Sequence, residues 1–375
     1  MPLPLSELDL RHLRHALRLA ARGRYRTSPN PMVGAVVVRD GEVVGEGYHR
    51  RYGGPHAEVE AFGRAGSRAK GATLYVTLEP CDHHGKTPPC SLAVLDAGIH
   101  RVVACHRDPN PQVGGEGFAR LRGAGVEVDS GHLVEEAVRL NWRFLSTMVY
   151  KRPAVTVKWA MSLDGRIATV DGESQWISSS AGRRWALAQR EEHDAILVGI
   201  GTALADDPRL NRRLGRADEP NIRVILDRRL RLPPAASLFD LPGRVLVYTE
   251  AEEGRETDAL TARGAHVVRL GMVEPAAVLE DLYQNQGVHS LLVEGGGTVA
   301  ASFARAGLFD RVAVDVAPLL IGGETAPGPL RGGGFTPLAT APRLADLRVE
   351  RRGEDVILVG FRDRCLQDLF ASVAD

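Results

Sequence analysis

The 375-residue sequence has few cysteines, few aromatic residues, no excess of charge of either sign and no long apolar run. Four cysteines are too few for a disulfide framework in a chain of this length, and they fit a reducing compartment. Basic and acidic residues number 47 each and aromatic residues make up 5%, which gives no reason to expect a nucleic acid as partner. No apolar stretch reaches membrane-spanning length, so we expect no membrane association.

The first twenty residues are not typical of a signal peptide, because basic and histidine side chains interrupt every apolar stretch. Leucines and alanines recur there at helical spacing instead, and Ser6 stands where a helix N-cap is expected. We therefore expect a cytoplasmic protein whose chain starts with an amphipathic helix.

The length of the chain favours two domains, which we place at residues 1–150 and 151–375. In the first, strands and helices alternate in a βαβ manner, which predicts a mostly parallel sheet covered by helices. The second reads as another α/β unit. Its strands are expected near 155–160, 195–199, 222–226, 245–248, 266–270, 290–294, 312–317 and 356–359, and its helices near 178–190, 275–284 and 298–306.

The most informative pattern is the run His56-Ala57-Glu58, followed by Pro80-Cys81 and Pro89-Cys90. One imidazole and two thiolates can hold a zinc ion, and the fourth position then stays open for water, as in a catalytic site. A glutamate two residues after the histidine can move protons to and from that water. This is the general pattern of zinc deaminases, although here the second cysteine lies nine residues after the first instead of three.

Local structure gives these residues a reason to converge. His56 follows Gly53-Gly54-Pro55 and Cys90 follows two prolines, so each is expected to open a helix, whereas Cys81 leaves the end of a strand. Helix N-termini carry partial positive charge and free N–H groups, which lower the pKa of a thiol placed there. A structural zinc site is the alternative if His83 or His84 supplies a fourth ligand.

From residue 30 to residue 110 the sequence resembles the deaminase domain of the bifunctional pyrimidine deaminase/reductases of riboflavin biosynthesis. The cysteine spacing of nine is that family's own pattern, and the resemblance covers nearly the whole chain. The matching segments are Pro29-Asn30-Pro31-x-Val33-Gly34, Gly45-x-Gly47-Tyr48-His49, Pro55-His56-Ala57-Glu58, Thr77-Leu78-Glu79-Pro80-Cys81-x-His83-His84-Gly85-Lys86-Thr87-Pro88-Pro89-Cys90 and Asp108-Pro109-Asn110-Pro111.

This resemblance implies a cytidine-deaminase-like, three-layer first domain that deaminates 2,5-diamino-6-ribosylamino-4(3H)-pyrimidinone 5′-phosphate with zinc. His56, Cys81 and Cys90 would bind the metal. Glu58 would take a proton from the attacking water and deliver it to the ring nitrogen and the leaving amine. The residues implied in substrate binding are Asn30, His49, His83, Lys86, Thr87, Asp108 and Asn110, of which Lys86 and Thr87 have donors suited to a phosphate.

A glycine-rich segment, Gly295-Gly296-Gly297, lies between an expected strand and an expected helix in the second domain. It fits the pattern G-x-G-x-x-A, which favours a phosphate or dinucleotide site because glycines let the backbone approach a phosphate at a helix N-terminus. The segment comes late in its domain, with little chain left for a full nucleotide-binding unit, so it does not predict a Rossmann fold. A tight turn without any ligand is the alternative.

Four further segments resemble the reductase domain of the same family, whose fold is similar to dihydrofolate reductase: 158–166, 172–178, 201–208 and 293–296. The resemblance implies that NADPH reduces the ribose of 5-amino-6-(5-phosphoribosylamino)uracil to a ribityl chain. The residues implied in NADPH binding are Ala160, Trp176, Thr202, Asp206, Gly296 and Gly297. Those implied in substrate binding are Lys158, Ser174, Arg190, Leu210, Arg213 and Glu294. The sequence leaves open which of Lys158, Asp206 and Glu294, if any, donates a proton.

The sequence thus predicts an α/β protein with two enzymatic domains, zinc and NADPH as cofactors, and phosphorylated pyrimidines as substrates. The family suggests a homo-oligomer. One alternative is a zinc deaminase acting on another nucleotide or on a nucleic-acid base, with an inactive or different second domain. Another is a zinc-stabilised interaction module without activity, which would need four closed ligands and no Glu58.

Overall fold

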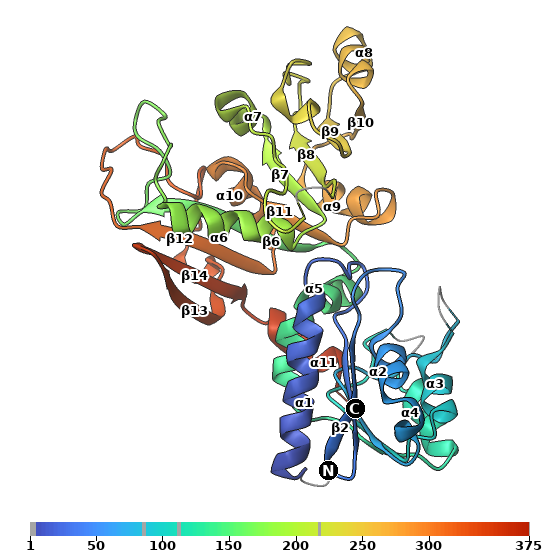
Figure 1. The fold of residues 1–375 in the computed structure, drawn as a ribbon. Coiled ribbons are helices and arrows are strands. Elements are labelled where there is room, and N and C mark those ends of the chain that lie inside the picture. Colours follow the sequence, from blue (N-terminus) through green and yellow to red (C-terminus); the bar gives the residue numbers. More distant parts are fainter. Residues whose placement is uncertain (1–4, 85–87, 111–113, 217–218, 375) are drawn as a thin grey trace. The chain divides into compact units, whose positions relative to one another are not determined.

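The computed structural model describes residues 5–84, 88–110, 114–216 and 219–374, and it divides the chain into two compact units. The first unit contains residues 1–151 together with 366–375, and the second contains residues 152–365. Each unit has its own sheet (Figure 1). No helix in the part of the chain that the structure describes combines the length and the apolar character that a membrane crossing requires.

The first unit is built on a five-stranded sheet in the order β2-β1-β3-β4-β5. Ser6 caps its first helix through a reciprocal pair of hydrogen bonds with Asp9, which confirms the expected N-cap. Short 3-10 turns lie at Ala21–Gly23 and Gly66–Ala69. The elements are α1 (Glu7–Ala20), β1 (Gly34–Arg39), β2 (Glu42–Tyr48), α2 (Ala57–Ala65), β3 (Thr73–Val76), α3 (Cys90–Asp96), β4 (Arg101–Ala104), α4 (Glu116–Gly123), β5 (Glu127–Asp129), α5 (Val134–Tyr150) and α11 (Cys365–Ser372).

The prediction of a mostly parallel sheet is wrong for this unit. β1 runs antiparallel to both β2 and β3, and only the β3–β4 and β4–β5 pairs are parallel. The tight turn at Asp40-Gly41 reverses the chain between β1 and β2, and Asp40 and Gly41 both have positive φ. The chain then passes through α2 into β3, which pairs with β1 and not with β2. The direction of β1 is therefore opposite to that of both of its neighbours in the sheet.

Helices cover both faces of this sheet, which gives the three layers expected. One apolar cluster joins the sheet to α2, α3 and α4, and the other joins it to α1 and α5. On the first face α2 lies against β2 at glycines, because a side chain at Gly45 or Gly47 would collide with the carbonyl groups of Ala61 and Ala57. These close approaches fix the position of α2, which starts beside His56.

The second unit is built on a nine-stranded sheet in the order β10-β9-β8-β7-β11-β6-β12-β14-β13. Neighbouring strands from β10 to β12 are parallel, and β14 and β13 add an antiparallel hairpin. The strands are β6 (Ala154–Ser162), β7 (Ala195–Gly199), β8 (Ile222–Leu226), β9 (Val245–Thr249), β10 (Ala265–Arg269), β11 (Ser290–Val293), β12 (Arg311–Ala317), β13 (Leu344–Arg352) and β14 (Asp355–Arg362). The helices are α6 (Ser180–Glu191), α7 (Ile200–Asp206), α8 (Arg255–Ala262), α9 (Pro275–Gln284) and α10 (Gly297–Arg305), with 3-10 turns at Ser237–Phe239 and Leu338–Thr340.

The sequence did not predict three of these elements, namely α7, α8 and β13. β13 has mostly exposed residues, so the alternation of apolar and polar side chains that marks a half-buried strand is absent. α7 is short and α8 buries only Leu260, so neither shows the apolar periodicity of a helix packed on a core.

Candidate active sites: a metal centre and a cofactor cleft

Three ligand groups converge in the first unit as the sequence predicts. His56 is the N-cap residue of α2, Cys90 is the first residue of α3, and Cys81 lies beyond the end of β3. Their ligand atoms all lie within 4.8 Å of one another. Nδ1 of His56 is 3.2 Å from Sγ of Cys90 and 3.5 Å from Sγ of Cys81. This spacing fits a single tetrahedral zinc ion, whose bonds to nitrogen and sulfur are about 2.0–2.3 Å long.

The described residues offer the metal three ligands and not four. His83 and His84 are exposed and lie outside the group of converging atoms. A closed structural site through either histidine therefore has no support in this geometry. Three protein ligands leave one position for water, which is the arrangement of catalytic zinc.

The environment of Cys81 favours its thiolate. A hydrogen bond from the Cys90 side chain contributes most to lowering the pKa of Cys81 to about 4, and burial acts in the opposite direction. His56 and the backbone N–H of Cys90 lower this pKa further, with N···S at 3.4 Å for the latter. That N–H belongs to the first residue of α3, so the helix start stabilises the neighbouring thiolate of Cys81. The expectation of a lowered pKa for the thiol at the helix start is not met, because the hydrogen bond with Cys81 and burial raise the pKa of Cys90.

Glu58 is a buried acid beside the three ligands. It lies in the first turn of α2 and is only 3% exposed. Burial raises the pKa of Glu58 to about 7, the charge of Cys81 adds to this effect, and His56 opposes it. A carboxyl group that titrates near neutral pH can both accept and donate a proton, which suits general acid–base work.

Asn30 and His49 form a hydrogen-bonded pair next to the metal ligands. The His49 ring lies edge-on to the His56 ring, with centroids 5.4 Å apart. Its Nδ1 is 3.0 Å from the carbonyl oxygen of Pro55, so it donates there, and its Nε2 accepts from the amide of Asn30 at 3.2 Å. Burial lowers the pKa of His49, which keeps the ring neutral for this pairing. The structure thus brings both predicted residues to the site.

Asp108 and Asn110 lie on one loop, and a residue with no predicted role holds it. Glu79 is 3% exposed, and its Oε2 accepts the backbone N–H groups of Asp108 and Gly115, both at 2.9 Å. Its Oε1 accepts the N–H of Phe118 at 3.0 Å. Burial raises the pKa of Asp108 to about 6. A glutamate directly before Pro80-Cys81, at the end of a buried strand, was the signal for this role.

The remaining predicted substrate-binding residues of the first unit belong to the loop between the two cysteines. His83 is exposed and close enough to Asp108 for its charge to act on that carboxyl group. The predicted residues Lys86 and Thr87 lie outside the described residues. Asp82 anchors the start of the loop by accepting hydrogen bonds from Ser91 and Arg120.

The second unit contains a cleft of about 1220 Å³ at the ends of its parallel strands. Helices α7 and α10 both begin at this cleft, so free N–H groups point toward it. The N–H of Gly296 donates to Oγ1 of Thr202 at 3.0 Å, and this bond ties the glycine-rich turn to α7. Eight predicted residues line the cleft: Lys158, Ala160, Ser174, Thr202, Asp206, Glu294, Gly296 and Gly297.

One charged residue of this cleft, Glu294, is paired in the interior of the protein with Arg190, which does not itself line the cleft. Arg190 donates to both carboxylate oxygens of Glu294, at distances down to 2.6 Å. Burial would raise the pKa of Glu294, but the charges of Arg190 and Lys158 outweigh it and lower that pKa. For Lys158 burial is the larger effect and lowers the pKa, against the opposing charge of Glu294.

Besides Arg190, three predicted residues do not line the cleft. Leu210 is buried with 1% exposure, and Arg213 is exposed and donates to the side chain of Asn211 at 3.0 Å. Trp176 is 69% exposed, and the Arg183 guanidinium lies 4.7 Å from the centre of its ring.

Sequence reasoning missed a group of arginines on the wall of the cleft: Arg228, Arg229, Arg231, Arg305 and Arg331. A cleft of this size with several guanidinium groups and two helix N-termini fits an extended, multiply phosphorylated ligand such as NADPH. The only sequence signal for these residues was the run Arg228-Arg229-Leu230-Arg231, which taken alone is typical of a solvated loop.

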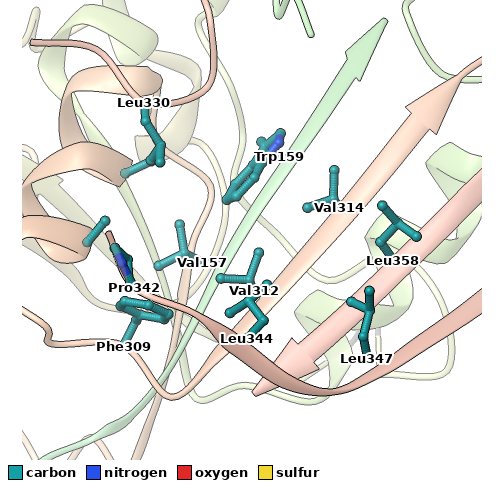
Figure 2. Close-up of a pocket in the computed structure, with 12 residues that line it drawn as sticks. Val157, Trp159, Phe309, Val312, Val314, Leu330, Pro342, Leu344, Leu347 and Leu358 are labelled. Carbon is teal, nitrogen blue, oxygen red and sulfur yellow. The ribbon is translucent and has the colours of Figure 1, made fainter. Parts of the chain in front are cut away.

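A second hollow of about 260 Å³ lies between the antiparallel end of the sheet and α10 (Figure 2). It is lined by aliphatic and aromatic side chains, including Trp159, Phe309 and Leu358. Trp159 and Val157 flank Lys158 on β6, so they point to the opposite face of the sheet from the lysine. The hollow offers no charged group to a substrate.

Both halves of the chain match known protein families. Residues 6–106 match the cytidine and deoxycytidylate deaminase zinc-binding region, and residues 153–358 match the RibD C-terminal domain. The riboflavin biosynthesis protein RibD of Aquifex aeolicus is 41% identical and that of Escherichia coli 42% identical, with 94% and 93% of this chain and 98% of each relative covered.

Solved structures agree with these matches. RibD of Acinetobacter baumannii is 38% identical with a TM-score of 0.87, and 95% of this chain and 99% of that one are covered. A diaminohydroxyphosphoribosylaminopyrimidine deaminase/5-amino-6-(5-phosphoribosylamino)uracil reductase from Thermotoga maritima is 36% identical with a TM-score of 0.83 and the same coverage. These findings confirm the resemblance noted from the sequence. The chain belongs to the RibD family of bifunctional riboflavin biosynthesis enzymes, with a zinc-dependent deaminase unit and an NADPH-dependent reductase unit.

Proposed function

We propose that this enzyme catalyses two successive reactions of riboflavin biosynthesis. The first is hydrolytic deamination of 2,5-diamino-6-ribosylamino-4(3H)-pyrimidinone 5′-phosphate. The second is NADPH-dependent reduction of the ribose of 5-amino-6-(5-phosphoribosylamino)uracil to the ribitylamino product. The buried Glu58 beside the group of His56, Cys81 and Cys90 is the observation that carries the proposal, because a metal-binding module without activity would not need it.

In the deaminase unit, the ligands His56, Cys81 and Cys90 would hold Zn²⁺, which when bound makes a water molecule acidic enough to act as nucleophile. Glu58 would take one proton from that water and pass it to the ring nitrogen, and would then carry the second proton, from the newly formed hydroxyl group, to the amine that leaves as ammonia. Its pKa of about 7 suits both transfers. The pair of Asn30 and His49 is placed to orient the pyrimidine beside the ligands. We assign substrate contacts to the remaining predicted residues: His83, Lys86, Thr87, Asp108 and Asn110.

In the reductase unit, NADPH supplies the hydride, and the residues of the cleft position the reactants. We assign cofactor contacts to Ala160, Trp176, Thr202, Asp206, Gly296 and Gly297. We assign substrate contacts to Lys158, Ser174, Arg190, Leu210, Arg213 and Glu294. Reduction of an open imine sugar adds a hydride to carbon and a proton to nitrogen. Lys158 lies in the wall of the cleft, and its Nζ is our candidate donor of that proton.

We also propose that the deaminase domain spans residues 1–150 and the reductase domain residues 151–375. The described residues 366–374 are an exception, because they belong to the first compact unit, where the Tyr150 hydroxyl donates to Asp368 at 2.7 Å. The family suggests a homo-oligomer that works in the cytoplasm, and the four cysteines, none of which forms a disulfide, are in keeping with a reducing compartment. Light scattering coupled to size exclusion tests the oligomer, and cell fractionation tests the location.

A coupled assay tests the two activities together. The diaminopyrimidine ribosylamino-phosphate is supplied with NADPH, and ammonia release and NADPH oxidation are followed at the same time. We expect both signals, with a chelator abolishing ammonia release. Ammonia without NADPH oxidation would contradict the role of the second unit, and the absence of both signals would contradict the substrate.

A further inference from the structure

A row of ionisable side chains crosses four neighbouring strands behind the reductase cleft. Glu294 directly follows β11 and comes alongside Lys158 of β6, because the preceding residues Val293 and Val157 are paired. On β12, Asp315 pairs with Ala160, which shares a face of β6 with Lys158. Asp355 begins β14, and the antiparallel register places it on the same face as Asp315.

Helix α6 lies over the strands β6 and β12, which carry Lys158 and Asp315 (Figure 1). Near its C-terminal end, Arg190 pairs with Glu294. At its start, the N-cap residue Ser179 donates two hydrogen bonds to Oδ2 of Asp355, from its backbone N–H at 2.9 Å and from its hydroxyl at 2.7 Å. In between, Gly182 lies directly over the carboxyl groups, since a Cβ atom there would collide with oxygens of both Asp315 and Asp355. The helix therefore seals the two aspartates from water.

Both aspartates are completely buried, with 0% exposure. Among the residues that the structure describes, neither oxygen of Asp315 accepts a hydrogen bond of good geometry, although Ser178 lies close by. Oδ1 of Asp355 likewise has no partner within those residues. Three buried oxygens without donors are costly in a folded protein unless a proton lies between the two groups.

Two carboxylates in one dry site cannot both stay ionised, because their mutual repulsion adds to the cost of burial. Burial raises the pKa of Asp315 and the charge of Asp355 raises it further, while Ser178 and Lys158 act against this. With one shared proton the pair carries a single negative charge. Among the charges that act on Lys158, that of Glu294 is larger than that of Asp315, but the charge of Arg190 opposes it. The aspartate pair therefore adds a second negative charge that helps to balance Lys158.

We propose that Asp315 and Asp355 share one proton and together supply the negative charge that keeps Lys158 protonated in the wall of the cleft. The two aspartates are positioning residues, since they do not line the cleft and act on the substrate only through the lysine. This inference rests on the proposed reductase function. It adds to that function a role for two buried acids that contact neither the cofactor nor the substrate.

The charged and titratable groups around Lys158 come from every element packed against it. They are Glu294 beyond β11, Arg190 on α6, Asp315 on β12 and, one strand further, Asp355. His193 lies near Glu294 but is buried and bonded on both ring nitrogens, to the carbonyl of Gln189 and to Thr156. Within the described residues, the aspartate pair is therefore the negative group near Lys158 that forms no ion pair with an arginine, whereas Glu294 pairs with Arg190.

The test uses the full-length, zinc-loaded enzyme, with deaminated substrate made by its own first unit. The double variant Asp315→Asn/Asp355→Asn keeps the shape of both side chains and removes their charge. We expect the alkaline limb of the kcat/KM profile for NADPH oxidation, which reports loss of the Lys158 proton, to move to lower pH by about one unit. We expect the KM for NADPH and the rate of deamination to stay as in the wild type. A limb that does not move overturns the proposal.

The single variants test the shared proton. Asn at either position leaves one carboxylate in the pair, so neither Asp315→Asn nor Asp355→Asn should move the limb; a shift in both would show that both groups are ionised. The matched control is Asp310→Asn, a fully buried aspartate that pairs with Arg152 at the other end of β12. It should reduce stability and leave the limb in place.

Two further outcomes are decisive. If the double variant fails to bind NADPH, measured by quenching of protein fluorescence, the single variants decide, and a limb that moves in either overturns the shared proton. If the wild type itself does not oxidise NADPH with the deaminated substrate, the proposed reductase function fails. An active wild type with identical limbs in all variants refutes only the role of the aspartate pair.

Discussion

Arg190 and Glu294 form a two-pronged ion pair that joins α6 to the turn after β11. The guanidinium donates to both carboxylate oxygens, and the side chains are 15% and 10% exposed. The pair borders the cleft through Glu294, next to Lys158. The ion pair therefore holds the Glu294 carboxylate in place beside Lys158 before a ligand binds.

Breaking this pair should damage the reductase and spare the deaminase. We expect Arg190→Gln to leave a buried carboxylate without its partner and to lower the unfolding free energy of the second unit by about 3 kcal/mol. NADPH oxidation should fall about 100-fold or more. Ammonia release should not change. Arg263→Gln is the control, because its ion pair with Asp240 is exposed and should contribute less than about 1 kcal/mol. Equal effects of the two substitutions would contradict the role given to Arg190.

Replacing the buried acid of the first unit should stop its chemistry without releasing the metal. We expect Glu58→Gln to reduce the rate of deamination by about 10²–10⁴-fold, because the amide cannot transfer a proton. Zinc content, measured by atomic absorption, should match that of the wild type. Glu60→Gln is the control on the same helix, since Glu60 pairs with Arg50 and Arg64 at the surface. Deamination by Glu58→Gln at the normal rate would refute the assignment.

Metal removal should separate the two activities. The ligands His56, Cys81 and Cys90 belong to the first unit, and the cleft residues belong to the second. We expect a chelator to abolish ammonia release and to leave NADPH oxidation with deaminated substrate within about twofold of its starting rate. One equivalent of Zn²⁺ should restore deamination. Loss of both activities would show that the metal also supports the reductase.

The sequence was sufficient for the residues that carry local chemistry. His56, Cys81, Cys90 and Glu58 could be found because turn prolines, helix starts and ligand types all lie within a short segment. Most strands and helices were also predictable, since buried strands are continuous apolar runs. The structure adds a hydrogen bond between His49 and Asn30. These residues are nineteen positions apart, and no local sequence pattern indicates that they meet.

Long-range relationships could not be predicted from the sequence. The turn at Asp40-Gly41 predicts that β1 and β2 are antiparallel. The antiparallel pairing of β1 with β3 depends on strand order, which the sequence does not state. Glu79 and Asp315 look like ordinary acidic residues until the fold buries them. Arg228 and Arg331 reach one cleft from segments about a hundred residues apart, which sequence spacing does not indicate.

The stability of the first unit should decrease in acid through Asp9. This residue is 8% exposed and accepts hydrogen bonds from the Tyr75 hydroxyl at 2.5 Å and from Arg101 at 3.0 Å. Burial would raise its pKa, but the hydrogen bonds from Ser6 and Tyr75 and the charge of Arg101 outweigh it and lower the pKa of Asp9 from 3.8 to about 2. A lowered carboxyl pKa stabilises the folded state above about pH 4, and the contribution is lost as the pH falls toward 2.

This contribution amounts to about 2 kcal/mol at neutral pH. We expect Asp9→Asn to reduce the free energy of opening of α1, measured by hydrogen–deuterium exchange, by about that amount at pH 6. At pH 3 the difference from the wild type should be smaller. A difference that stays constant between the two pH values would show that the ionised form of Asp9 has no special stabilising role.

Glu79 should control substrate binding through the loop that it holds. Its two oxygens accept three backbone N–H groups, from Asp108, Gly115 and Phe118. In Glu79→Gln an NH₂ group replaces one of the two oxygens and faces a backbone N–H group, which is also a donor. We expect this mismatch to cost about 1–3 kcal/mol of stability in the loop. We expect the KM of deamination to rise about tenfold with kcat within about threefold, because the loop shifts while the metal ligands and Glu58 stay in place. Zinc content should not change. A variant that loses zinc, or that lowers kcat with KM unchanged, would show that Glu79 supports the metal centre and not the substrate loop.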